Sequence, residues 1–343
     1  MVRQDPTHWQ ILHLLKEQGN DFLSGTLLAS RLGLTRTAVW KHIQNLRGMG
    51  YDIQSHSKEG YRLLNVPDLL IPEEIVPGLK TRWLGRSYHH FPRISSTNDH
   101  ALLLAAQGAP HGTVVVAEEQ THGRGRLKRE WLSAPQKGIY FSILLRTPLP
   151  VQIASQTTLV AALALAKVIR NRYRLASSIK WPNDILIHHK KVAGILTEIQ
   201  SDMDLTRFQV IGVGINANYS EAELAGPFRY PASSLAIEMG SSIKRQELLL
   251  DFFHQFEEEY SRFIQEGFAD LLAELERYSA VLGRVIKILQ GEEEIEGKAL
   301  GFTPEGALRL LTKDRGVQII WVGDVTRVGE MDFPQVENGA AEG

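Results

Sequence analysis

Apolar residues recur at helical spacing over 27–32 and again over 39–46, near the start of the chain. Gly33 lies between the two stretches, and Thr35 can cap the second helix by accepting a hydrogen bond from a backbone N–H of its first turn. Two helices joined by a four-residue turn that contains glycine form a helix-turn-helix. The spacing therefore predicts this motif in the first part of the chain.

The middle of the chain has a different pattern. Runs rich in Val and Ile occupy 113–117, 139–145, 185–187 and 208–213, and one clear helix is predicted over 154–170. This alternation predicts an α/β domain with a mixed sheet. Prolines at 67, 72 and 77 mark a linker before it.

The last third begins with a strongly amphipathic helix. Its apolar residues are spaced three and four apart from Leu249 to Phe263, and Gly267 is expected to end or kink it. Short alternating strands with glycine turns follow over 286–327, a pattern typical of a small β-barrel. We thus divide the chain into 1–66, 67–279, 280–330 and a flexible acidic tail at 331–343.

Composition narrows the protein class. The 343 residues suffice for two or three domains, and a formal net charge of -1 gives no whole-chain reason to expect nucleic-acid binding. Cysteine is absent, which excludes disulfides, thiolate metal sites and a cysteine nucleophile. The N-terminus has no signal-like apolar segment, and the apolar stretch at 159–169 is shorter than the roughly 20 residues that span a bilayer. We expect a soluble, cytoplasmic protein without a membrane partner.

Residues 1–66 nevertheless carry a local positive charge of +3, from eight Lys and Arg against five Asp and Glu. The segment YDIQSHSKEGYRLL at 51–64 predicts a two-stranded wing that turns at 58–60. Donors suited to phosphates and base edges lie opposite the buried face of the second helix: Arg36, Thr37, Trp40, Lys41 and Gln44. The alternative is a helical domain with a solvated basic face, and the capped helix with its wing favours DNA binding.

The stretch HGRGRLKREW at 122–131, which we call the Arg-Gly loop, is the first candidate for chemistry. Gly123 and Gly125 allow backbone amides to approach a polyanion closely, and the four cations at 124, 126, 128 and 129 can neutralise phosphate oxygens. Trp131 offers a flat face to a purine, or an anchor to the core. Taken alone, such a loop is more often a mobile surface turn.

Two further stretches carry polar groups. In KWPNDILIHHKKVAGIL, at 180–196, Asp184 could help hold Mg²⁺ while a lysine contacts a phosphate or carboxylate; a plain hairpin is the alternative. In ISSTNDH, at 94–100, the hydroxyls and the amide either cap a helix or contact a small polar ligand.

The order of these motifs resembles that of the biotin protein ligases: S-T-N, E-x-Q-x-x-G-R-G-R-x-x-R-x-W, K-W-P-N-D, K-x-A-G-I-L and G-x-G-x-N. With its helix-turn-helix, the chain resembles the bifunctional bacterial form over nearly its whole length. The resemblance implies a central domain like that of class II synthetases and lipoate ligases, and a C-terminal SH3-like barrel. Lipoate ligation is the nearest enzymatic rival, which the Arg-Gly loop and the helix-turn-helix disfavour.

Members of this family activate biotin with MgATP to biotinyl-5'-adenylate and transfer it to a lysine of the biotin carboxyl carrier protein of acetyl-CoA carboxylase. The bifunctional form also represses the biotin operon, and we expect the adenylate to act as corepressor for a ligand-linked homodimer on operator DNA. Two alternatives are a ligase whose N-terminal domain binds no DNA and a biotin-sensing repressor without turnover. Lys180 and Lys191, with the Arg-Gly loop intact, argue against the second.

The resemblance also implies roles for individual residues. Biotin would contact Ser96, Thr97, Asn98, Gln120, Gly123, Arg124, Gly125, Arg126, Lys191 and Gly194. ATP and the adenylate would contact Arg129, Trp131, Lys180 and Asn183. The catalytic residues would be Lys191, Arg126 and Asp184, with Asp184 also near Mg²⁺ or the incoming amine. The Arg-Gly loop would be a flexible lid, although Lys128 stands where relatives often have glycine. Gly212 and Gly214 would let the backbone approach the ligand.

Overall fold

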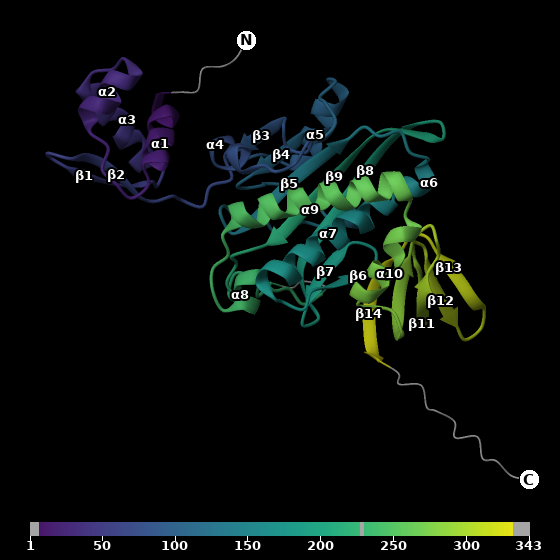
Figure 1. Cartoon of the computed structure of the whole chain (residues 1–343). Coiled ribbons are helices and arrows are strands. Elements are labelled where there is room, and N and C mark those ends of the chain that lie inside the picture. Colours follow the sequence, from purple (N-terminus) through teal and green to yellow (C-terminus); the bar gives the residue numbers. More distant parts are fainter. Residues whose placement is uncertain (1–6, 227–229, 332–343) are drawn as a thin grey trace, which may run out of the picture. The chain divides into compact units, whose positions relative to one another are not determined.

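The computed structural model describes residues 7–226 and 230–331, and the chain divides into two compact units between Leu69 and Leu70 (Figure 1). The first unit contains α1 (Thr7–Gln18), α2 (Gly25–Leu32), α3 (Arg36–Gly48), β1 (Asp52–His56) and β2 (Gly60–Asn65). The second contains a mixed sheet with its helices and a smaller β-rich part.

The helix-turn-helix and its wing are confirmed. Ser24 caps α2, and the Thr35 hydroxyl accepts a hydrogen bond from the Ala38 N–H at 3.2 Å, as the sequence predicts. Gly33 ends α2 in the left-handed region at φ 65°. Strands β1 and β2 pair antiparallel around the expected turn. The helix α1 was not predicted; it packs its apolar side into the core that α2 and α3 share.

The large sheet of the second unit has seven strands in the order β3-β4-β5-β9-β8-β7-β6. Their bounds are β3 (Tyr88–Phe91), β4 (Val114–Ala117), β5 (Gly138–Leu145), β6 (Ser178–Lys180), β7 (Asp184–Ile187), β8 (Lys190–Asp202) and β9 (Leu205–Asn216). Strands β3 and β4 are parallel and the other neighbours antiparallel, so the predicted mixed sheet is confirmed.

Helices cover both faces of this sheet. The α-helices of this unit are α4 (Pro72–Ile75), α5 (Thr97–Ala106), α6 (Val151–Ala154), α7 (Gln156–Tyr173), α8 (Leu235–Met239), α9 (Arg245–Glu266) and α10 (Ala269–Tyr278). Two short 3-10 helices are η1 (Val76–Gly78) and η2 (Arg126–Lys128). Helix α5 packs on β4, β5 and β9 through a separate apolar cluster, whereas α7 and α9 pack together in the main core. Gly267 follows the last residue of α9, as predicted.

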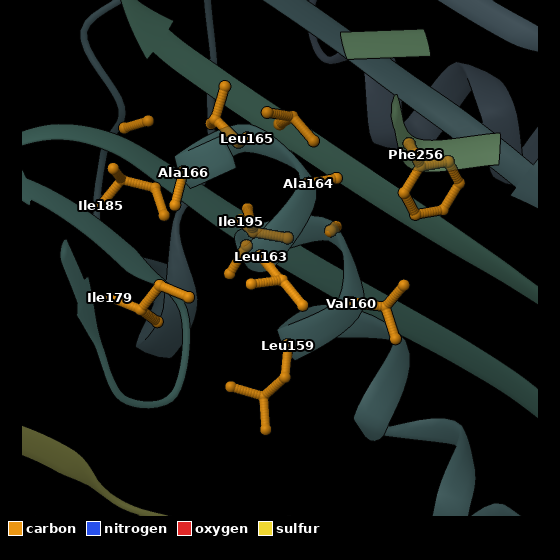
Figure 2. Close-up of a cluster of buried hydrophobic side chains, with 14 of the residues drawn as sticks. Leu159, Val160, Leu163, Ala164, Leu165, Ala166, Ile179, Ile185, Ile195 and Phe256 are labelled. Carbon is orange, nitrogen blue, oxygen red and sulfur yellow. The ribbon is translucent and has the colours of Figure 1, made fainter. Parts of the chain in front are cut away.

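The main core explains the apolar character of α7. Side chains on this helix, among them Leu163 and Val160, meet Ile179, Ile195 and Phe256 from β6, β8 and α9 (Figure 2). Full burial of such a side chain contributes about 1.5–3 kcal/mol. The segment Val151–Tyr173 is long and apolar enough to cross a membrane, but 72% of its apolar window is buried inside the protein, which identifies it as a core helix.

The C-terminal strands form a five-stranded antiparallel sheet in the order β13-β12-β11-β10-β14. Their bounds are β10 (Arg284–Gln290), β11 (Glu293–Phe302), β12 (Leu308–Thr312), β13 (Gly316–Ile320) and β14 (Asp324–Met331). The predicted small β-rich part is thus present. Its edge strands β13 and β14 do not pair with each other within 284–331, so a closed barrel is not confirmed. The tail was predicted over 331–343; residue 331 belongs to β14, and the rest of the predicted tail lies outside the described residues.

A buried ion pair fixes the strand that leads to the site. Glu118, just after β4, accepts hydrogen bonds from Arg245 Nη1 at 2.7 Å and from the Leu70 N–H at 2.9 Å. Burial alone would raise the pKa of Glu118, but the neighbouring His90 ring, Arg245 and the Leu70 N–H favour the carboxylate and lower this pKa to about 2. Gln120, two residues further, is thereby positioned from a rigid support.

Candidate active site

A cavity of about 380 Å³ lies in the second unit, where the Arg-Gly loop meets β7, β8, β9 and the beginning of β14. It gathers residues from motifs that are far apart in the sequence. Of those singled out from the sequence, its lining includes Ser96, Thr97, Asn98, Gln120, Arg124, Gly125, Arg126, Arg129, Trp131, Lys180, Asn183, Asp184, Lys191 and Gly194. A volume near 400 Å³ is within the usual range for a small-molecule site.

Gly123 is absent from this lining. It lies behind the wall, where an added Cβ would come within 2.6 Å of Ser133 Oγ and of the Trp131 carbonyl oxygen. The requirement for glycine at this position is therefore close packing of the loop on its own support. The expectation of a biotin contact at Gly123 finds no geometric support here.

Four neutral side chains form a hydrogen-bonded group that we call the neutral polar cluster: Thr97, Asn98, Gln120 and Ser142. The first three line the cavity, and Ser142 lies behind them; Gln120 is half-buried and the other three are buried. The Thr97 N–H donates to Gln120 Oε1 at 2.8 Å, and Ser142 Oγ lies 2.8 Å from Thr97 Oγ1 and 2.6 Å from Asn98 Oδ1. These groups can both donate and accept hydrogen bonds, so they suit an uncharged polar ligand.

Ser96 borders this cluster but has a local role. Its hydroxyl accepts a hydrogen bond from the Asp99 N–H at 3.4 Å and caps α5. Capping was the alternative to ligand contact at the sequence level, and here the residue both caps the helix and lines the cavity.

Two carboxylates hold the beginning of the Arg-Gly loop. The Arg124 guanidinium pairs with Asp99, and its Nη2 also lies 3.5 Å from Glu198 Oε1. Asn98 Nδ2 donates to Glu198 Oε2 at 2.7 Å, which connects the loop to the neutral polar cluster. Asp99 and Glu198 were not identified from the sequence. Asp99 follows S-T-N directly, but Glu198 stands in β8 with no distinguishing motif.

The charged centre consists of Lys180, Asp184 and Lys191, which we call the lysine-aspartate cluster. Asp184 Oδ1 lies 2.6 Å from Lys191 Nζ, and Oδ2 lies 2.9 Å from Lys180 Nζ. Asp184 and Lys180 are buried. Burial would raise the pKa of Asp184, but the charges of Lys191 and Lys180 favour the carboxylate, and the pKa lies below its usual range.

The expected magnesium role of Asp184 was tested against this geometry. Both of its oxygens already contact ammonium groups, and no group of three His, Asp or Glu side chains suited to a metal occurs among residues 7–226 and 230–331. Mg²⁺ is coordinated by oxygen ligands in octahedral geometry, and it loses its bound waters reluctantly. This carboxylate therefore does not fit a resident magnesium ion, and the magnesium role stays a prediction that the geometry disfavours.

Trp131 covers the charged centre. Lys191 Nζ lies 5.2 Å from the centroid of its ring, a cation–π distance. A Cβ at Gly214 would come within 2.4 Å of the Trp131 indole, and one at Gly212 within 2.1 Å of Asn98 Oδ1. The two glycines were expected to admit a ligand. In the structure both glycines line the cavity, and they also make room for side chains of the site itself.

The second half of the Arg-Gly loop is tied to distant segments. Arg126 Nη1 donates to Asn183 Oδ1 at 3.2 Å, and its Nη2 donates to the Gly323 carbonyl at 3.0 Å. Arg129 Nη2 lies 2.6 Å from Asp324 Oδ2. Burial lowers the pKa of Arg126, with Asp324 and Asp184 acting in the opposite direction.

Sequence reasoning did not identify the contribution of β14 to this site. Besides Asp324, the Val325 carbonyl accepts a hydrogen bond from Lys180 Nζ at 3.1 Å. Tyr230 also borders the cavity, with Lys180 Nζ 4.4 Å from its ring centroid. These residues belong to no recognisable motif, and the side chains that they contact lie far away in the sequence.

Lys128 has φ +57°, and Leu127 before it has φ +56°. This left-handed region favours glycine, so Lys128 adopts a backbone conformation that is costly for a residue with a side chain. The loop is otherwise held by its own backbone, with Gly125 N–H donating to the Arg129 carbonyl at 2.7 Å.

The candidate DNA-binding face lies on α3 in the first unit. Arg36, Thr37, Trp40 and Lys41 are exposed, and Gln44 is half-buried. Trp40 leaves 51% of its surface accessible, so it does not pack inside the domain, which was the alternative for this bulky residue. The sequence of α3 contains no acidic residue, and its outer face suits a polyanion.

Comparison with known proteins supports both parts. Residues 90–216 match the model of the biotin/lipoate A/B protein ligase family, and residues 8–62 match an HTH domain. The chain is 38% identical over 315 residues to the bifunctional ligase/repressor BirA of Bacillus subtilis, covering 92% of this chain and 97% of that protein. It is 32% identical to the bifunctional ligase/repressor BirA of Escherichia coli, covering 88% and 92%. The biotin protein ligase from Aquifex aeolicus in complex with biotin and ATP has a TM-score of 0.60 and 30% identity, covering 70% of this chain and 97% of that one.

Proposed function

Because the chain belongs to the biotin/lipoate A/B protein ligase family, we infer that it is a biotin protein ligase that also acts as a repressor. It activates biotin with ATP to biotinyl-5'-adenylate and transfers biotin to a lysine of the biotin carboxyl carrier protein of acetyl-CoA carboxylase. With the adenylate as corepressor, its helix-turn-helix domain represses the biotin operon. The observation that carries this inference is that the Arg-Gly loop, the lysine-aspartate cluster and the neutral polar cluster meet in one cavity.

The first step requires charge neutralisation. A carboxylate oxygen of biotin forms a bond to the α-phosphorus of ATP, and the bond from that phosphorus to pyrophosphate breaks. Negative charge grows on the phosphate oxygens, so a fixed cation stabilises the transition state more than the ground state. We assign this role to Lys191, which Asp184 holds in place, with Arg126 as a second cation.

The nucleotide enters as its magnesium complex, and Mg²⁺ neutralises the charge of its phosphates. Because both oxygens of Asp184 contact lysines, the phosphate oxygens of the nucleotide would hold Mg²⁺ rather than this carboxylate. Asp184 then acts by fixing the positions and charges of Lys180 and Lys191.

The two ends of the ligand differ in polarity. The ureido ring of biotin is uncharged and both donates and accepts hydrogen bonds, which the neutral polar cluster complements. Arg124, Gly125 and Gly194 line the same cavity and are assigned to biotin as well. The adenylate is assigned to Trp131, Arg129, Lys180 and Asn183, where a flat ring and several cations are available.

In the second step, the amine of the carrier lysine attacks the acyl carbon of the adenylate and AMP leaves. The adenylate is a mixed anhydride that water hydrolyses, so its cover has a chemical purpose. We propose that the Arg-Gly loop is this cover and that ligand binding closes it. Its contacts to Asp99, Asn183 and Asp324 are suited to hold a closed position.

Repression adds a requirement for symmetry. We propose that adenylate binding favours a homodimer whose two winged helices contact a palindromic operator, with Arg36, Thr37, Trp40, Lys41 and Gln44 facing the DNA. We further propose that the C-terminal sheet is an SH3-like barrel that contributes to nucleotide and carrier binding, and that the protein is cytoplasmic.

Biotin-dependent release of pyrophosphate from ATP tests the enzymatic proposal. Wild type should release pyrophosphate with biotin and fail to do so with lipoate, because the neutral polar cluster suits the ureido ring. Activity with lipoate alone would support the rival lipoate ligase. Binding of biotin without any pyrophosphate would leave a sensor without turnover.

A further inference from the structure

Two buried phenols meet beside the site. Tyr140 lies in β5, and Tyr219 lies three residues after β9. Their hydroxyl oxygens are 2.6 Å apart, and both side chains are almost completely buried. Neither residue lines the cavity, so neither was assigned to the ligand.

The pair is bonded to the end of the Arg-Gly loop. Tyr219 Oη accepts a hydrogen bond from the Ala134 N–H at 2.8 Å and lies 3.2 Å from the Leu132 carbonyl. Tyr140 Oη lies 3.0 Å from the Ala134 carbonyl. Leu132 directly follows Trp131, the residue that covers the lysine-aspartate cluster. The phenols therefore fix the backbone from which the indole projects.

The backbone of Tyr219 is in turn bonded to the segment that pairs with Lys191. The Tyr219 carbonyl accepts a hydrogen bond from Ser234 Oγ at 2.6 Å. Next to Ser234, the Ser233 N–H donates to the Lys191 carbonyl at 3.0 Å, and the Lys191 N–H donates to the Pro231 carbonyl at 2.7 Å. Tyr219 is thus connected to the backbone of Lys191 through the neighbouring residues Ser233 and Ser234.

The two tyrosine hydroxyls have fewer protons than there are acceptors around them, so the loss of one hydroxyl should disturb their contacts. Two phenolic protons face three acceptors: the partner hydroxyl, the Leu132 carbonyl and the Ala134 carbonyl. At 2.6 Å one proton must lie between the two hydroxyls, so one proton is left for the two carbonyls. Burial raises the pKa of both phenols, and both stay protonated at neutral pH.

We propose that the Tyr140–Tyr219 pair positions the Arg-Gly loop relative to the segment that carries Lys191. The loop and this segment then close over the adenylate as one unit. Both tyrosines are positioning residues, because they act through Trp131 and Lys191 rather than on the ligand. The proposal rests on the proposed function for its chemical consequence, which is retention of the adenylate, whereas the coupling of the two segments is a property of the protein alone.

Tyr219→Phe and Tyr140→Phe test the pair by removing one hydroxyl and keeping the ring. Tyr260→Phe is the matched control, since Tyr260 is buried among the aromatic rings of α9. Trypsin cleavage within the Arg-Gly loop is the first readout, because the loop offers Arg and Lys sites and needs no ligand. We expect cleavage about tenfold faster in both site variants, as for loss of one buried hydrogen bond, and no change in the control.

The second readout is the rate at which preformed biotinyl-5'-adenylate leaves or is hydrolysed, measured with the KM for ATP. In both site variants the adenylate should be lost about tenfold faster and the KM for ATP should be higher. Their kcat at saturation should stay within about twofold of wild type. The double variant should show the same effects as each single variant, because either substitution alone already breaks the hydrogen bond between the two hydroxyls.

Equal cleavage and adenylate retention in Tyr219→Phe, Tyr140→Phe and Tyr260→Phe would overturn the proposal. Additive effects in the double variant would also overturn it, because they indicate two independent packing sites. Failure of wild type to form adenylate would instead contradict the proposed function, and the trypsin result would still decide the coupling.

Discussion

Asp184 Oδ1 lies 2.6 Å from Lys191 Nζ, and the other oxygen of this buried carboxylate contacts Lys180. One negative charge thus holds two cations at the point where the Arg-Gly loop, β7 and β8 meet. Removing one charge of this cluster should destabilise the folded protein, since a buried charge that loses its counterion is strongly destabilising. Lys191, the proposed catalytic lysine, is therefore also part of the buried framework.

Replacing Asp184 with Asn should lower the free energy of unfolding by about 3 kcal/mol at pH 7, because Lys180 is left buried without its counterion. Urea unfolding measures this change. Asp99→Asn is the control, since Asp99 forms a partly exposed pair with Arg124 and its loss should change stability by less than about 1 kcal/mol. Similar small losses in both variants would contradict a charged, tightly coupled centre.

Glu118 gives a prediction for pH. Its pKa in the folded protein is about 2, below the ordinary 4.5, so the carboxylate stabilises the fold above about pH 4.5 and this contribution disappears as the pH falls toward 2. A shift of this size corresponds to about 3 kcal/mol. The difference in unfolding free energy between wild type and Glu118→Gln should be constant near neutral pH and shrink in acid.

Glu119→Gln serves as the control for that experiment, because the Glu119 side chain is partly exposed and pairs with Arg93. Its effect should stay below about 1 kcal/mol at every pH. If the difference for Glu118→Gln instead grew on acidification, the assigned direction of the pKa shift would be wrong.

Gly214→Ala should displace Trp131, because the added Cβ would come within 2.4 Å of the indole. We expect the KM for ATP to rise by about tenfold or more, since the predicted adenine contact moves away. In a Trp131→Ala background the same change should have little further effect, because the clash is gone. An equal penalty in both backgrounds would show that Gly214 acts on something other than Trp131.

Lys41 tests the DNA-binding face. Lys41→Ala should weaken binding to all DNA sequences and reduce the salt dependence of log K by about one unit of slope, as for loss of one phosphate contact. Biotin transfer should be unchanged, since α3 belongs to the other unit. Lys313→Ala, an exposed lysine between β12 and β13, is the control and should leave DNA binding unaltered.

Ligand linkage has its own test. Operator binding at one stated salt concentration should tighten when biotin and ATP are both present, because the adenylate is the proposed corepressor. Adding biotin alone should do less. Affinity that is the same under all conditions would remove the proposed coupling and favour a ligase whose N-terminal domain serves another purpose.

Local pattern predicted much of this fold. The capped helix at Thr35, the wing and the end of α9 before Gly267 each depend on a few neighbouring residues, and all three are confirmed. The sequence motifs also indicated many of the residues that line the cavity, although Gly123 does not line it and the contributions of Tyr230 and β14 were missed. The helix α1 was not predicted, although its buried residues Ile11, Leu12 and Leu15 have helical spacing.

Long-range pairing could not be predicted in the same way. Arg129 and Asp324 are 195 residues apart, and nothing near Asp324 indicates a binding site. The positive φ of Lys128 is equally hidden, because a lysine there gives no signal of left-handed backbone. Barrel closure depends on how the edge strands of the C-terminal sheet are placed, which alternation alone does not determine.

Transfer of labelled biotin to a purified biotin carboxyl carrier domain with MgATP tests the central claim most directly. Wild type should transfer the label, and Lys191→Ala should be slower by about two to three orders of magnitude, as for loss of a group that stabilises developing charge. Lys190→Ala is the matched control, because its side chain is exposed on the neighbouring position of β8. A folded wild type that binds biotin but transfers none, or a Lys191→Ala variant as active as wild type, would contradict the account.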